Sequence, residues 1–362
     1  MDFNVYKDIE KRTNGEIYIG VVGPVRTGKS TFIKNFMDIA VVPNIKDENE
    51  VRRTMDELPQ SSAGKTIMTT EPKFIPNKAV NIKLGEKADL KVRLIDCVGF
   101  MVEGATGHME EDKERMVKTP WSSRAIPFHE AAEVGTGRVI REHSTIGLLI
   151  TGDGSFGEIP GENFREAEEK TVQELKKQGK PFLILINSQM PYKEALQLAE
   201  SLQKKYGVTT VTANCEQLKK EDITRILEKV LYEFPVSEIH FYVPKWVEML
   251  PLDHELKSQI LGQIRKLMKE LAHIRDVTKE RVQLEGPYVQ DTLLDHVGLS
   301  DGVVRIRVQI KDEYYYRILS ELCGVSMASE YDLIHTMKEL SQMKEKYVKV
   351  QSALEAVRGT GY

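Results

Sequence analysis

Cysteine is scarce in this sequence. Its 362 residues include three, Cys97, Cys215 and Cys323, which lie far apart without the spacing of metal ligands. This scarcity argues against a disulfide framework and fits the reducing conditions of the cytosol. We therefore expect each cysteine to be a small residue of the core.

Long apolar runs are missing as well. No stretch approaches the roughly 18 apolar residues of a membrane-spanning helix, and residues 1–8 lack the apolar region of a secretory signal. Charge of one sign is also lacking, since 51 basic residues stand against 55 acidic ones and the net charge is −4. We therefore expect an intracellular protein without a transmembrane segment, and neither nucleic acid nor an anionic membrane as its main partner.

One glycine-containing stretch carries a recognisable pattern. Residues 23–30 fit G-x-x-x-x-G-K-[ST], between an apolar run at 17–22 and a helical segment at 31–37. This order of strand, loop and helix is typical of a phosphate-binding loop, whose glycines let the backbone wrap around phosphate oxygens. The helix adds the positive end of its dipole. Lys29 is predicted to reach the β- and γ-phosphates, and Ser30 to bind Mg²⁺.

A second pattern supplies the acidic residue that such a loop needs. Residues 96–99 form D-x-x-G at the end of an apolar strand, so Asp96 is predicted to hold Mg²⁺ and Gly99 to approach the γ-phosphate. Between the two patterns, Thr69 or Thr70 is predicted to sense the γ-phosphate and close on the metal.

These predictions define three sets of residues. The predicted nucleotide-binding residues are Gly23, Arg26, Thr27, Gly28, Lys29, Ser30, Thr31, Gly99 and Asn187. The predicted catalytic residues are Lys29, Thr69, Thr70 and Asp96, and the predicted metal ligands are Ser30, Thr70 and Asp96. For Arg26, a solvated position and a phosphate contact are both open.

Two features of guanine nucleotide hydrolases are absent from the sequence. Guanine is normally read by the aspartate of N-K-x-D after a buried strand, but residues 187–190 read N-S-Q-M. ATP is therefore the predicted nucleotide. Phe100 follows Gly99 in place of the glutamine that orients water in many GTPases. Hydrolysis is expected to be slow, or to depend on the two threonines, on the insertion 98–128, or on a neighbouring molecule.

The order of the predicted elements indicates an α/β fold. Apolar runs such as 182–186 are typical of parallel strands buried on both faces, and they alternate with helical segments. Residues 1–235 are therefore predicted to form a mostly parallel, doubly wound P-loop domain with a long insertion at 98–128. The polar stretch 43–70 is expected to be a loop. Predicted strands span 17–22, 79–84, 90–96, 145–151, 181–187 and 208–213, and later helices span 130–142, 162–177, 193–206 and 221–232.

Residues 236–362 are predicted to form a smaller α+β domain. Its predicted strands lie at 238–243 and 303–310, with 280–284 as a third candidate, and a long helical segment covers 256–274. The final helix, 330–358, carries apolar residues in a heptad stripe of about four repeats. We favour packing of this stripe on its own domain over an intermolecular coiled coil, because such stripes are common in ordinary bundles.

Several blocks of sequence resemble one known family. They are YIGVVG at 18–23, VRTGKSTFIK at 25–34, DELPQS at 56–61, AGKTIMTTEPKF at 63–74 and EHSTIG at 142–147. These blocks closely resemble the stage IV sporulation protein A family, the coat morphogenetic ATPases of endospore-forming bacteria. The resemblance is dense over about 1–235 and looser to the end of the chain. The block 66–74 has no counterpart in generic P-loop proteins, so the match is specific.

The resemblance implies a cytoskeleton-like protein of the mother cell that hydrolyses ATP. It would polymerise on the outer surface of the forespore membrane as the basement layer of the coat. Its partners would be further copies of itself, a small amphipathic membrane peptide that anchors it, and other spore coat proteins. The resemblance implies the same roles for Lys29, Ser30 and Asp96, and makes Thr69 and Thr70 the sensor threonines. Members of the family also carry a further C-terminal domain with a role in membrane targeting, which this chain is expected to lack.

Three functions are therefore weighed at the level of sequence. The first is an ATPase whose hydrolysis licenses self-assembly, the second is a GTPase-type regulatory switch acting through an effector, and the third is a small-molecule kinase. The missing N-K-x-D argues against the switch, and the D-x-x-G pattern argues against the kinase.

Overall fold

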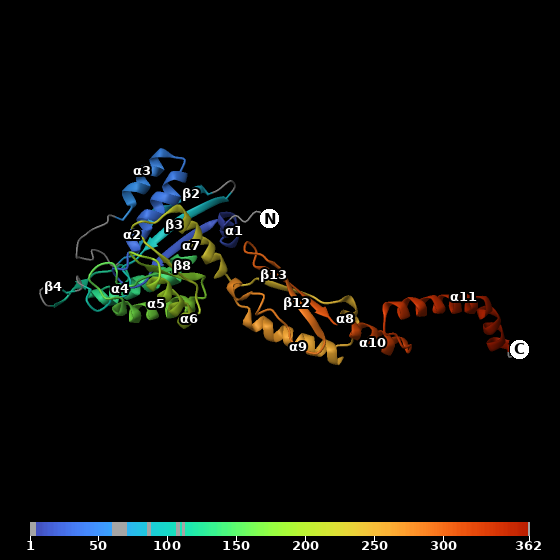
Figure 1. Ribbon diagram of the computed structural model, residues 1–362. Helices are drawn as coiled ribbons and strands as arrows, with labels where there is room; N and C mark the ends of the chain where they lie inside the picture. Colours follow the sequence, from blue (N-terminus) through green and yellow to red (C-terminus); the bar gives the residue numbers. More distant parts are fainter. Residues whose placement is uncertain (1–4, 60–70, 85–87, 106–108, 111–112, 361–362) are drawn as a thin grey trace. The chain divides into compact units, whose positions relative to one another are not determined.

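The computed structural model describes residues 5–59, 71–84, 88–105, 109–110 and 113–360. The chain forms two compact units, each described by itself below (Figure 1). The first unit runs to Glu238 and also includes Ala272–Asp276 and Val297–Val303. Sequence reasoning expected the boundary at 235–236 and did not predict that two later segments join the first unit.

The first unit is built on a six-stranded sheet with the strand order β10-β9-β8-β1-β3-β2. β1 pairs in parallel with β3 and β8, and β9 pairs in parallel with β8 and β10, whereas β2 runs antiparallel to β3. The predicted α/β fold with a mostly parallel sheet is confirmed. The strands are β1 (Glu16–Val22), β2 (Lys73–Leu84), β3 (Ala88–Asp96), β8 (Ile146–Gly152), β9 (Phe182–Asn187) and β10 (Thr210–Ala213).

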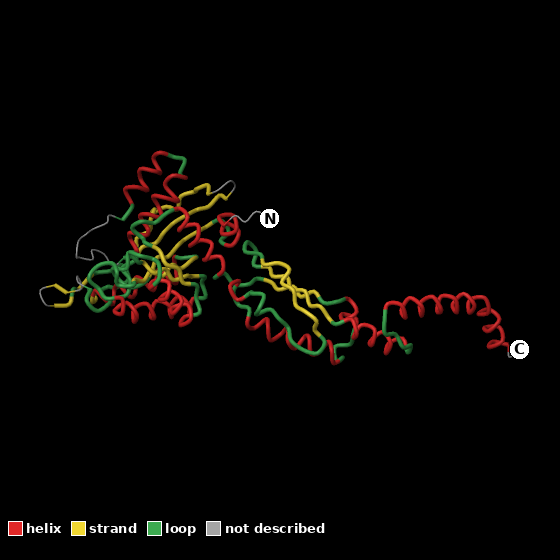
Figure 2. The backbone as a smooth tube through the Cα atoms, viewed as in Figure 1, coloured by secondary structure: helices red, strands yellow, loops and turns green. Residues whose placement is uncertain are grey.

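Alternate residues of the central strands face two separate cores. Leu148 and Ile150 of β8 join a core with residues of helices α2 and α7, whereas Leu149 joins a core with residues of α5 and α6. Figure 2 shows helices on both sides of these strands. Burial on both faces explains why the strands read as continuous apolar runs. The helices of this unit are α1 (Val5–Arg12), α2 (Lys29–Phe36), α3 (Glu48–Glu57), α4 (Phe128–Arg138), α5 (Arg165–Gln178), α6 (Glu194–Tyr206) and α7 (Lys220–Tyr232). π-helical turns at Met37–Val41 and Val139–His143 continue α2 and α4, and 3-10 turns lie at Val42–Asn44 and Gly161–Phe164.

The expectation of a loop over 43–70 is wrong for part of that stretch. Helix α3 lies within it and begins after Asp47, whose carboxylate accepts a hydrogen bond from the Asn49 N–H at 2.8 Å. The highly charged sequence of α3 concealed a helix with one buried residue, Thr54. Strand β2 begins at Lys73, earlier than the predicted 79, and its register against β3 shifts between Ile75 and Val80.

The insertion 98–128 includes short strand pairs in its described part. β4 (Met109–Glu110) pairs with β5 (Lys113–Glu114), and β6 (Met116–Val117) pairs with β7 (Ile126–Pro127). Its first residues pack on the phosphate loop, because Val25, Phe100, Val102 and Ala105 share a buried cluster with residues that precede and begin α5. The insertion is thus attached to the loop by apolar contacts.

The second unit contains a three-stranded sheet with the order β11-β13-β12. Strand β13 (Val303–Ile310) buries Val304, Ile306, Val308 and Ile310, so its predicted alternation is confirmed. The candidate strand at 280–284 is wrong, since these residues form a turn and loop. The third strand is β12 (Val289–Val297), whose many polar residues masked it in the sequence. The other elements are β11 (Glu238–Tyr242), α8 (Lys245–Met249), α9 (Glu255–Glu270), α10 (Asp312–Cys323) and α11 (Glu330–Thr360). A 3-10 turn at Ile274–Asp276 belongs to the later segment that joins the first unit.

Helix α11 confirms the predicted helix over 330–358, but not the packing that we favoured. The apolar residues Leu340, Met343, Tyr347, Val350, Leu354 and Val357 of the heptad stripe are all exposed. The expectation for Cys323 is also wrong, because this residue is exposed, whereas Cys97 and Cys215 are buried. A search of the described residues for a helix with the length and apolarity of a membrane span finds none.

Candidate functional site

The N-terminus of helix α2 is built to receive an anion. The helix begins at Lys29, directly after Gly28, whose φ of 89° lies in the left-handed region. Among the described residues no side chain caps this helix end, and its first turn has no acidic residue. The first N–H groups of a helix need partners from outside the helix. A phosphate group supplies such partners and is stabilised further by the helix dipole.

Gly99 brings the D-x-x-G segment into direct contact with the phosphate loop. Its φ is 95°, and a Cβ atom at this position would lie 2.0 Å from the Gly23 carbonyl oxygen and 2.8 Å from Lys29 Nζ. Glycine is therefore required both for the backbone conformation and for the close approach. The next residue, Phe100, donates its N–H to the Gly23 oxygen at 3.3 Å and accepts from the Val25 N–H at 3.0 Å. The backbone of Phe100 thus ties the two patterns together.

Lys29 lies inside the loop with only 5% of its surface exposed. Its ammonium group donates to the Pro24 carbonyl oxygen at 2.6 Å and lies 3.5 Å from that of Gly23. Burial lowers the pKa of Lys29 below the ordinary lysine value, and the neighbouring Asp96 carboxylate offsets part of this shift. The charge of Lys29 is therefore held where phosphate oxygens would lie in a loop of this type.

Ser30 and Asp96 meet, although they are far apart in the sequence. The Ser30 hydroxyl donates to Asp96 Oδ2 at 2.6 Å. In the part of the chain that the structure describes, the other oxygen, Asp96 Oδ1, is buried without a hydrogen-bond partner. Burial raises the pKa of Asp96 above the ordinary aspartate value. A carboxylate oxygen without a partner beside a serine hydroxyl fits Mg²⁺, which binds proteins through one or two oxygen ligands and completes its shell with phosphate and water.

A search for a second metal site gives a negative result. Within the described ranges no group of three or more histidine, cysteine, aspartate or glutamate side chains is placed to hold a metal ion. A magnesium ion at Ser30 and Asp96 does not need such a group, because the nucleotide supplies further oxygen ligands.

Thr27 and Asn187 support the loop from beneath. Thr27 is buried, and its hydroxyl donates to the carbonyl oxygens of Ile150 at 2.8 Å and Pro24 at 3.0 Å. The amide of Asn187 donates to the Thr27 oxygen at 3.2 Å and accepts from the Cys215 N–H at 3.0 Å. Both ends of the Asn187 side chain are thus engaged by the protein. These contacts place Asn187 beside the loop, and its contact with the nucleotide stays a prediction.

The remaining predicted residues occupy different positions. Arg26 is exposed at the apex of the loop with a φ of 61°, and Thr31 is half-buried in the first turn of α2. Gly23 is buried, and a Cβ atom there would lie 2.3 Å from the Ile150 oxygen. Thr69 and Thr70 lie outside the described residues.

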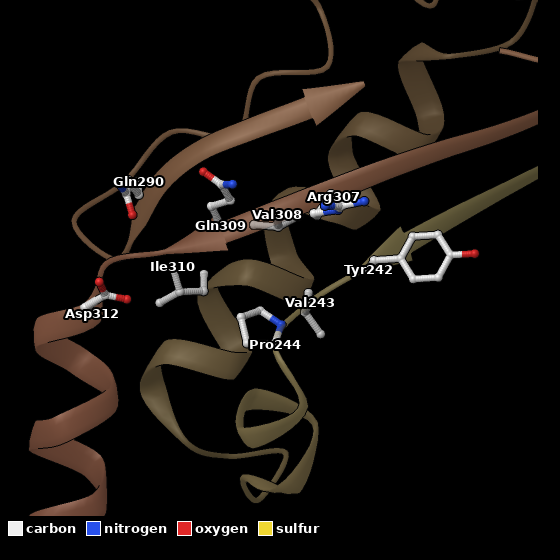
Figure 3. Close-up of a pocket in the computed structure, with 9 residues that line it drawn as sticks. All are labelled: Tyr242, Val243, Pro244, Gln290, Arg307, Val308, Gln309, Ile310 and Asp312. Atoms are coloured by element: carbon white, nitrogen blue, oxygen red, sulfur yellow. The ribbon is translucent and has the colours of Figure 1, made fainter. Parts of the chain in front are cut away.

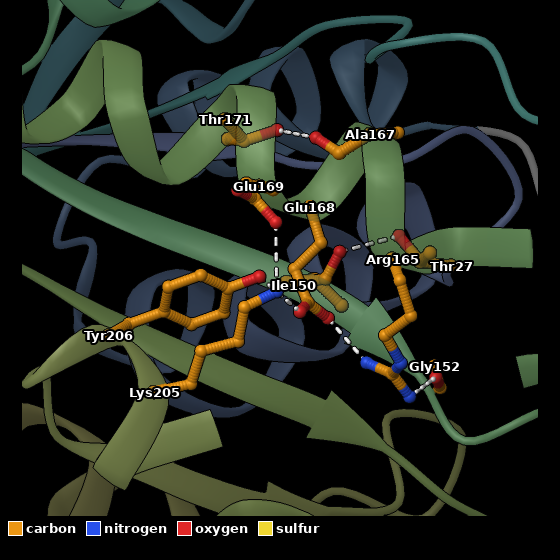
Figure 4. Close-up of polar contacts among 10 residues, drawn as sticks. All are labelled: Thr27, Ile150, Gly152, Arg165, Ala167, Glu168, Glu169, Thr171, Lys205 and Tyr206. Atoms are coloured by element: carbon orange, nitrogen blue, oxygen red, sulfur yellow. Dashed lines mark hydrogen bonds and ion pairs between the residues drawn. The ribbon is translucent and has the colours of Figure 1, made fainter. Parts of the chain in front are cut away.

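Sequence reasoning missed a buried ionic network that braces the sheet next to the loop (Figure 4). Glu168 on α5 is fully buried, accepts from Arg165 at 2.5 Å and from the Tyr206 hydroxyl at 3.1 Å, and so joins α5 to α6. Arg165 also reaches the Gly152 carbonyl oxygen at 3.5 Å, at the end of β8. A pattern of charges on a surface helix gives no sign of which glutamate is buried, so this network could not be read from the sequence.

The second unit contains a hollow (Figure 3), and none of the nucleotide-binding residues described above lines it. Its volume is about 470 Å³. Arg307, which lines it, is already paired with Asp295 at 2.8 Å. The hollow is lined by Tyr242, Val243, Pro244, Gln290, Arg307, Val308, Gln309, Ile310 and Asp312. These residues do not form a nucleophile, acid or metal site.

Comparison with known proteins gives consistent matches along the chain. Residues 1–235 match the family model described as stage IV sporulation protein A, ATPase domain, and residues 236–362 match that of its middle domain. The chain is 45% identical to stage IV sporulation protein A of Clostridioides difficile (strain 630), over 100% of this chain and 74% of that protein. It is 45% identical to the protein of the same name from Bacillus anthracis and 44% identical to that of Bacillus subtilis (strain 168). In both cases 99% of this chain and 73% of the relative are covered.

Proposed function

Because the chain belongs to the stage IV sporulation protein A family, we propose that it is a sporulation ATPase that self-assembles into the basement layer of the spore coat. The chain carries the ATPase domain of this family, which makes it an ATPase. Assembly, the forespore surface as its location, and partnership with an amphipathic membrane peptide and other coat proteins are the proposed part. Their support is the family resemblance of the blocks at 18–34 and 56–74 together with the matches to stage IV sporulation protein A of three bacteria.

The observation that carries the catalytic part is the meeting of the two nucleotide-binding patterns. The uncapped N-terminus of α2, the buried ammonium of Lys29, and the Ser30–Asp96 contact converge at the carboxyl ends of the parallel strands β1 and β3. In the proposed complex the N–H groups of the loop and Lys29 hold the β- and γ-phosphates of ATP. Ser30 and Asp96 hold Mg²⁺, which neutralises charge on the phosphate oxygens when bound.

Hydrolysis transfers the γ-phosphoryl group of ATP to water. The bond between water oxygen and phosphorus forms while the bond to the β-phosphate oxygen breaks, and ADP and phosphate leave. Lys29 favours this step because negative charge moves onto oxygens that its ammonium group faces. Asn187, Thr27 and Phe100 fix the loop before the nucleotide arrives, so little rearrangement is needed at the moment of reaction.

Nucleotide binding and turnover test this proposal directly. We expect phosphate release from Mg·ATP to exceed that from Mg·GTP, and Lys29→Ala to weaken ATP binding by at least about 100-fold. Lys34→Ala, on the same helix but away from the loop, is the matched control and should bind as the wild type does. Preference for GTP, or binding by Lys29→Ala within about threefold of wild type, would remove the loop from the account.

Thr70→Ala tests the proposed sensor role. The variant is expected to bind ATP and to lose turnover, because the sensor acts on the γ-phosphate only in the closed state. Unchanged turnover in this variant would move the role to Thr69 or to another residue.

A further inference from the structure

Helix α11 exposes most of the apolar residues of its heptad stripe. Assigning Leu333 to position a of the heptad places Leu340, Tyr347 and Leu354 at a, and Thr336, Met343, Val350 and Val357 at d. The exposed fractions are 50% for Leu340, 63% for Met343, 57% for Tyr347, 49% for Val350, 46% for Leu354 and 51% for Val357. The residues of this stripe are therefore available on the surface of the described chain.

Such an exposed apolar stripe indicates a surface to which a partner binds. Contiguous exposed apolar surface marks sites of association, because its burial removes apolar area from water. The spacing of the stripe is that of helices that supercoil around one another, with a and d side chains inserting between those of the facing helix. A single copy of α11 presents half of such an arrangement.

We propose that α11 pairs with α11 of a second copy of this chain as a parallel coiled coil. Charge favours this partner and this direction. In parallel pairing, position g of one helix faces position e of the next heptad on the other, which sets Glu339 opposite Lys344 twice, once on each side. Both side chains are exposed, and the contact that Glu339 makes, 3.9 Å from His335 Nδ1 on the same helix, lies on the surface.

Antiparallel pairing is less favourable. In antiparallel pairing each a residue faces a d residue, for example Leu340 and Val350 of the other copy. The two helices then cross at Glu345, which brings Lys344 and Lys346 of both copies close together. Like charges at such close positions are destabilising. The parallel arrangement avoids this cluster and stacks like residues, Leu on Leu and Val on Val, in successive layers.

The inference stands on α11 alone and does not require nucleotide. It supplies one contact for the self-assembly proposed above. If α11 pairing fails while ATP-driven growth of particles is found, only this inference falls. If pairing is found without such growth, only the assembly proposal falls.

The test is sedimentation equilibrium of the whole chain without nucleotide, at up to about 100 µM. Wild type is expected to show twice the mass of one chain or more. Leu340→Glu should weaken association by at least about 30-fold, because a charge enters the centre of the stripe. Gln342→Glu adds the same charge outside the stripe and is the matched control. Since both sites are exposed, neither change should unfold the chain, which circular dichroism checks.

Charge exchange tests the direction of pairing. Glu339→Lys and Lys344→Glu are each expected to weaken association by about fivefold, and the double variant to restore it. A monomeric wild type, or Leu340→Glu associating as Gln342→Glu does, overturns the pairing. A double variant no better than the single ones overturns the parallel direction.

A second inference concerns Arg26, and it rests on a different observation. Arg26 has a φ of 61° and is exposed, whereas its neighbours Val25 and Thr27 are buried. Residues other than glycine rarely take this conformation, and glycine would take it without strain. The loop therefore carries a long cation at a position where the backbone alone favours glycine.

We infer that Arg26 is a catalytic residue for the proposed hydrolysis of ATP. Phe100 occupies the place of the water-orienting glutamine, and it is buried with its backbone bonded to the loop. A cation at the apex of the phosphate loop can instead stabilise the charge that builds up on the phosphate oxygens in the transition state. An arginine supplied by the same chain has this role in other nucleotide hydrolases.

The test compares Arg26→Gly with Lys193→Gly. Both variants remove an exposed cation from a residue with positive φ, and Lys193 lies before α6. Arg26→Gly is expected to lower kcat by at least about 100-fold while the dissociation constant for Mg·ATP changes by less than fivefold. Arg26→Lys should recover part of the loss, and Lys193→Gly should behave as wild type.

A kcat for Arg26→Gly within about threefold of wild type overturns the inference. Weaker binding of Mg·ATP with kcat unchanged also overturns it, since the contact would then be equal in the ground and transition states. Failure of the wild type to hydrolyse ATP would instead count against the proposed function itself.

Discussion

The phosphate loop and the heptad stripe of α11 are both recognised by short sequence patterns, but their side chains differ in burial. Thr27 and Lys29 in the loop and Asn187 beside it are buried and bonded to backbone groups of the same chain. In α11 the side chains of the stripe are about half exposed. The nucleotide site is thus largely formed by folding, whereas the cover that we propose for α11 comes from association. Five substitution experiments test this contrast, from the largest expected effect to the smallest.

Replacing Asp96 tests the predicted metal ligand next to the loop. Asp96→Asn should lower Mg²⁺-dependent turnover by about 1,000-fold, because the amide carries no charge for the metal. Asp38→Asn, at an exposed acid of the same unit, should leave turnover unchanged. Equal activity of the two variants would contradict the assignment of Asp96.

The same substitution has a pH dependence whose sign follows from the raised pKa of Asp96. Between the ordinary aspartate pKa and the raised one, the folded protein holds a proton that the unfolded chain has lost. The unfolding free energy of wild type therefore falls as pH rises through this window. Asp96→Asn lacks this fall, so its stability relative to wild type should increase across the window, as urea titrations without nucleotide would show. A constant difference at all pH values would contradict the burial of the charge.

The ionic network of Figure 4 includes two adjacent glutamates whose replacements can be compared. Glu168→Ala should lower the unfolding free energy by about 3 kcal/mol, because it breaks a buried ionic contact with Arg165. Glu169→Ala removes an exposed pair with Lys205 and should cost less than about 1 kcal/mol. Similar losses for both would show that the network is not buried as described.

Asn187→Ala tests the support behind the loop. The change leaves the Thr27 oxygen and the Cys215 N–H without their partner, at an expected cost of about 1–2 kcal/mol. Gln189→Ala, two residues on and exposed, is the control. A direct nucleotide contact would instead appear as weaker ATP binding with unchanged stability.

The smallest effect is expected on α11. Leu340→Ala should change the unfolding free energy of the dilute, unassociated chain by less than about 0.5 kcal/mol. Leu183→Ala in β9, which is fully buried, should cost about 3 kcal/mol. A large loss for Leu340→Ala in the dilute chain would mean that the stripe is covered by its own unit.

The sequence predicted those parts of the molecule in which pattern and burial agree. The central strands and the α/β fold followed from apolar runs, and the pairing of residues 30 and 96 followed from two motifs. The charged helix α3 and the polar strand β12 were missed, because their few buried residues are outnumbered by polar ones. The placement of Asn187 beside the loop depends on contacts with residues far along the chain, which no local pattern records.

The predicted packing of α11 on its own domain was wrong for a related reason. A heptad stripe predicts that a helix face will be buried, but it does not identify the segment or molecule that buries it. Whether the cover comes from the same chain depends on the geometry of the whole unit, which the frequency of such stripes in ordinary bundles does not reveal.

Sedimentation velocity of the whole chain with and without Mg·ATP tests the central claim most directly. The account predicts that Mg·ATP converts wild type into particles much larger than the α11-linked form, and that Lys29→Ala stays in that form. Particles of the same size with and without Mg·ATP, or large particles formed equally by Lys29→Ala, would contradict it.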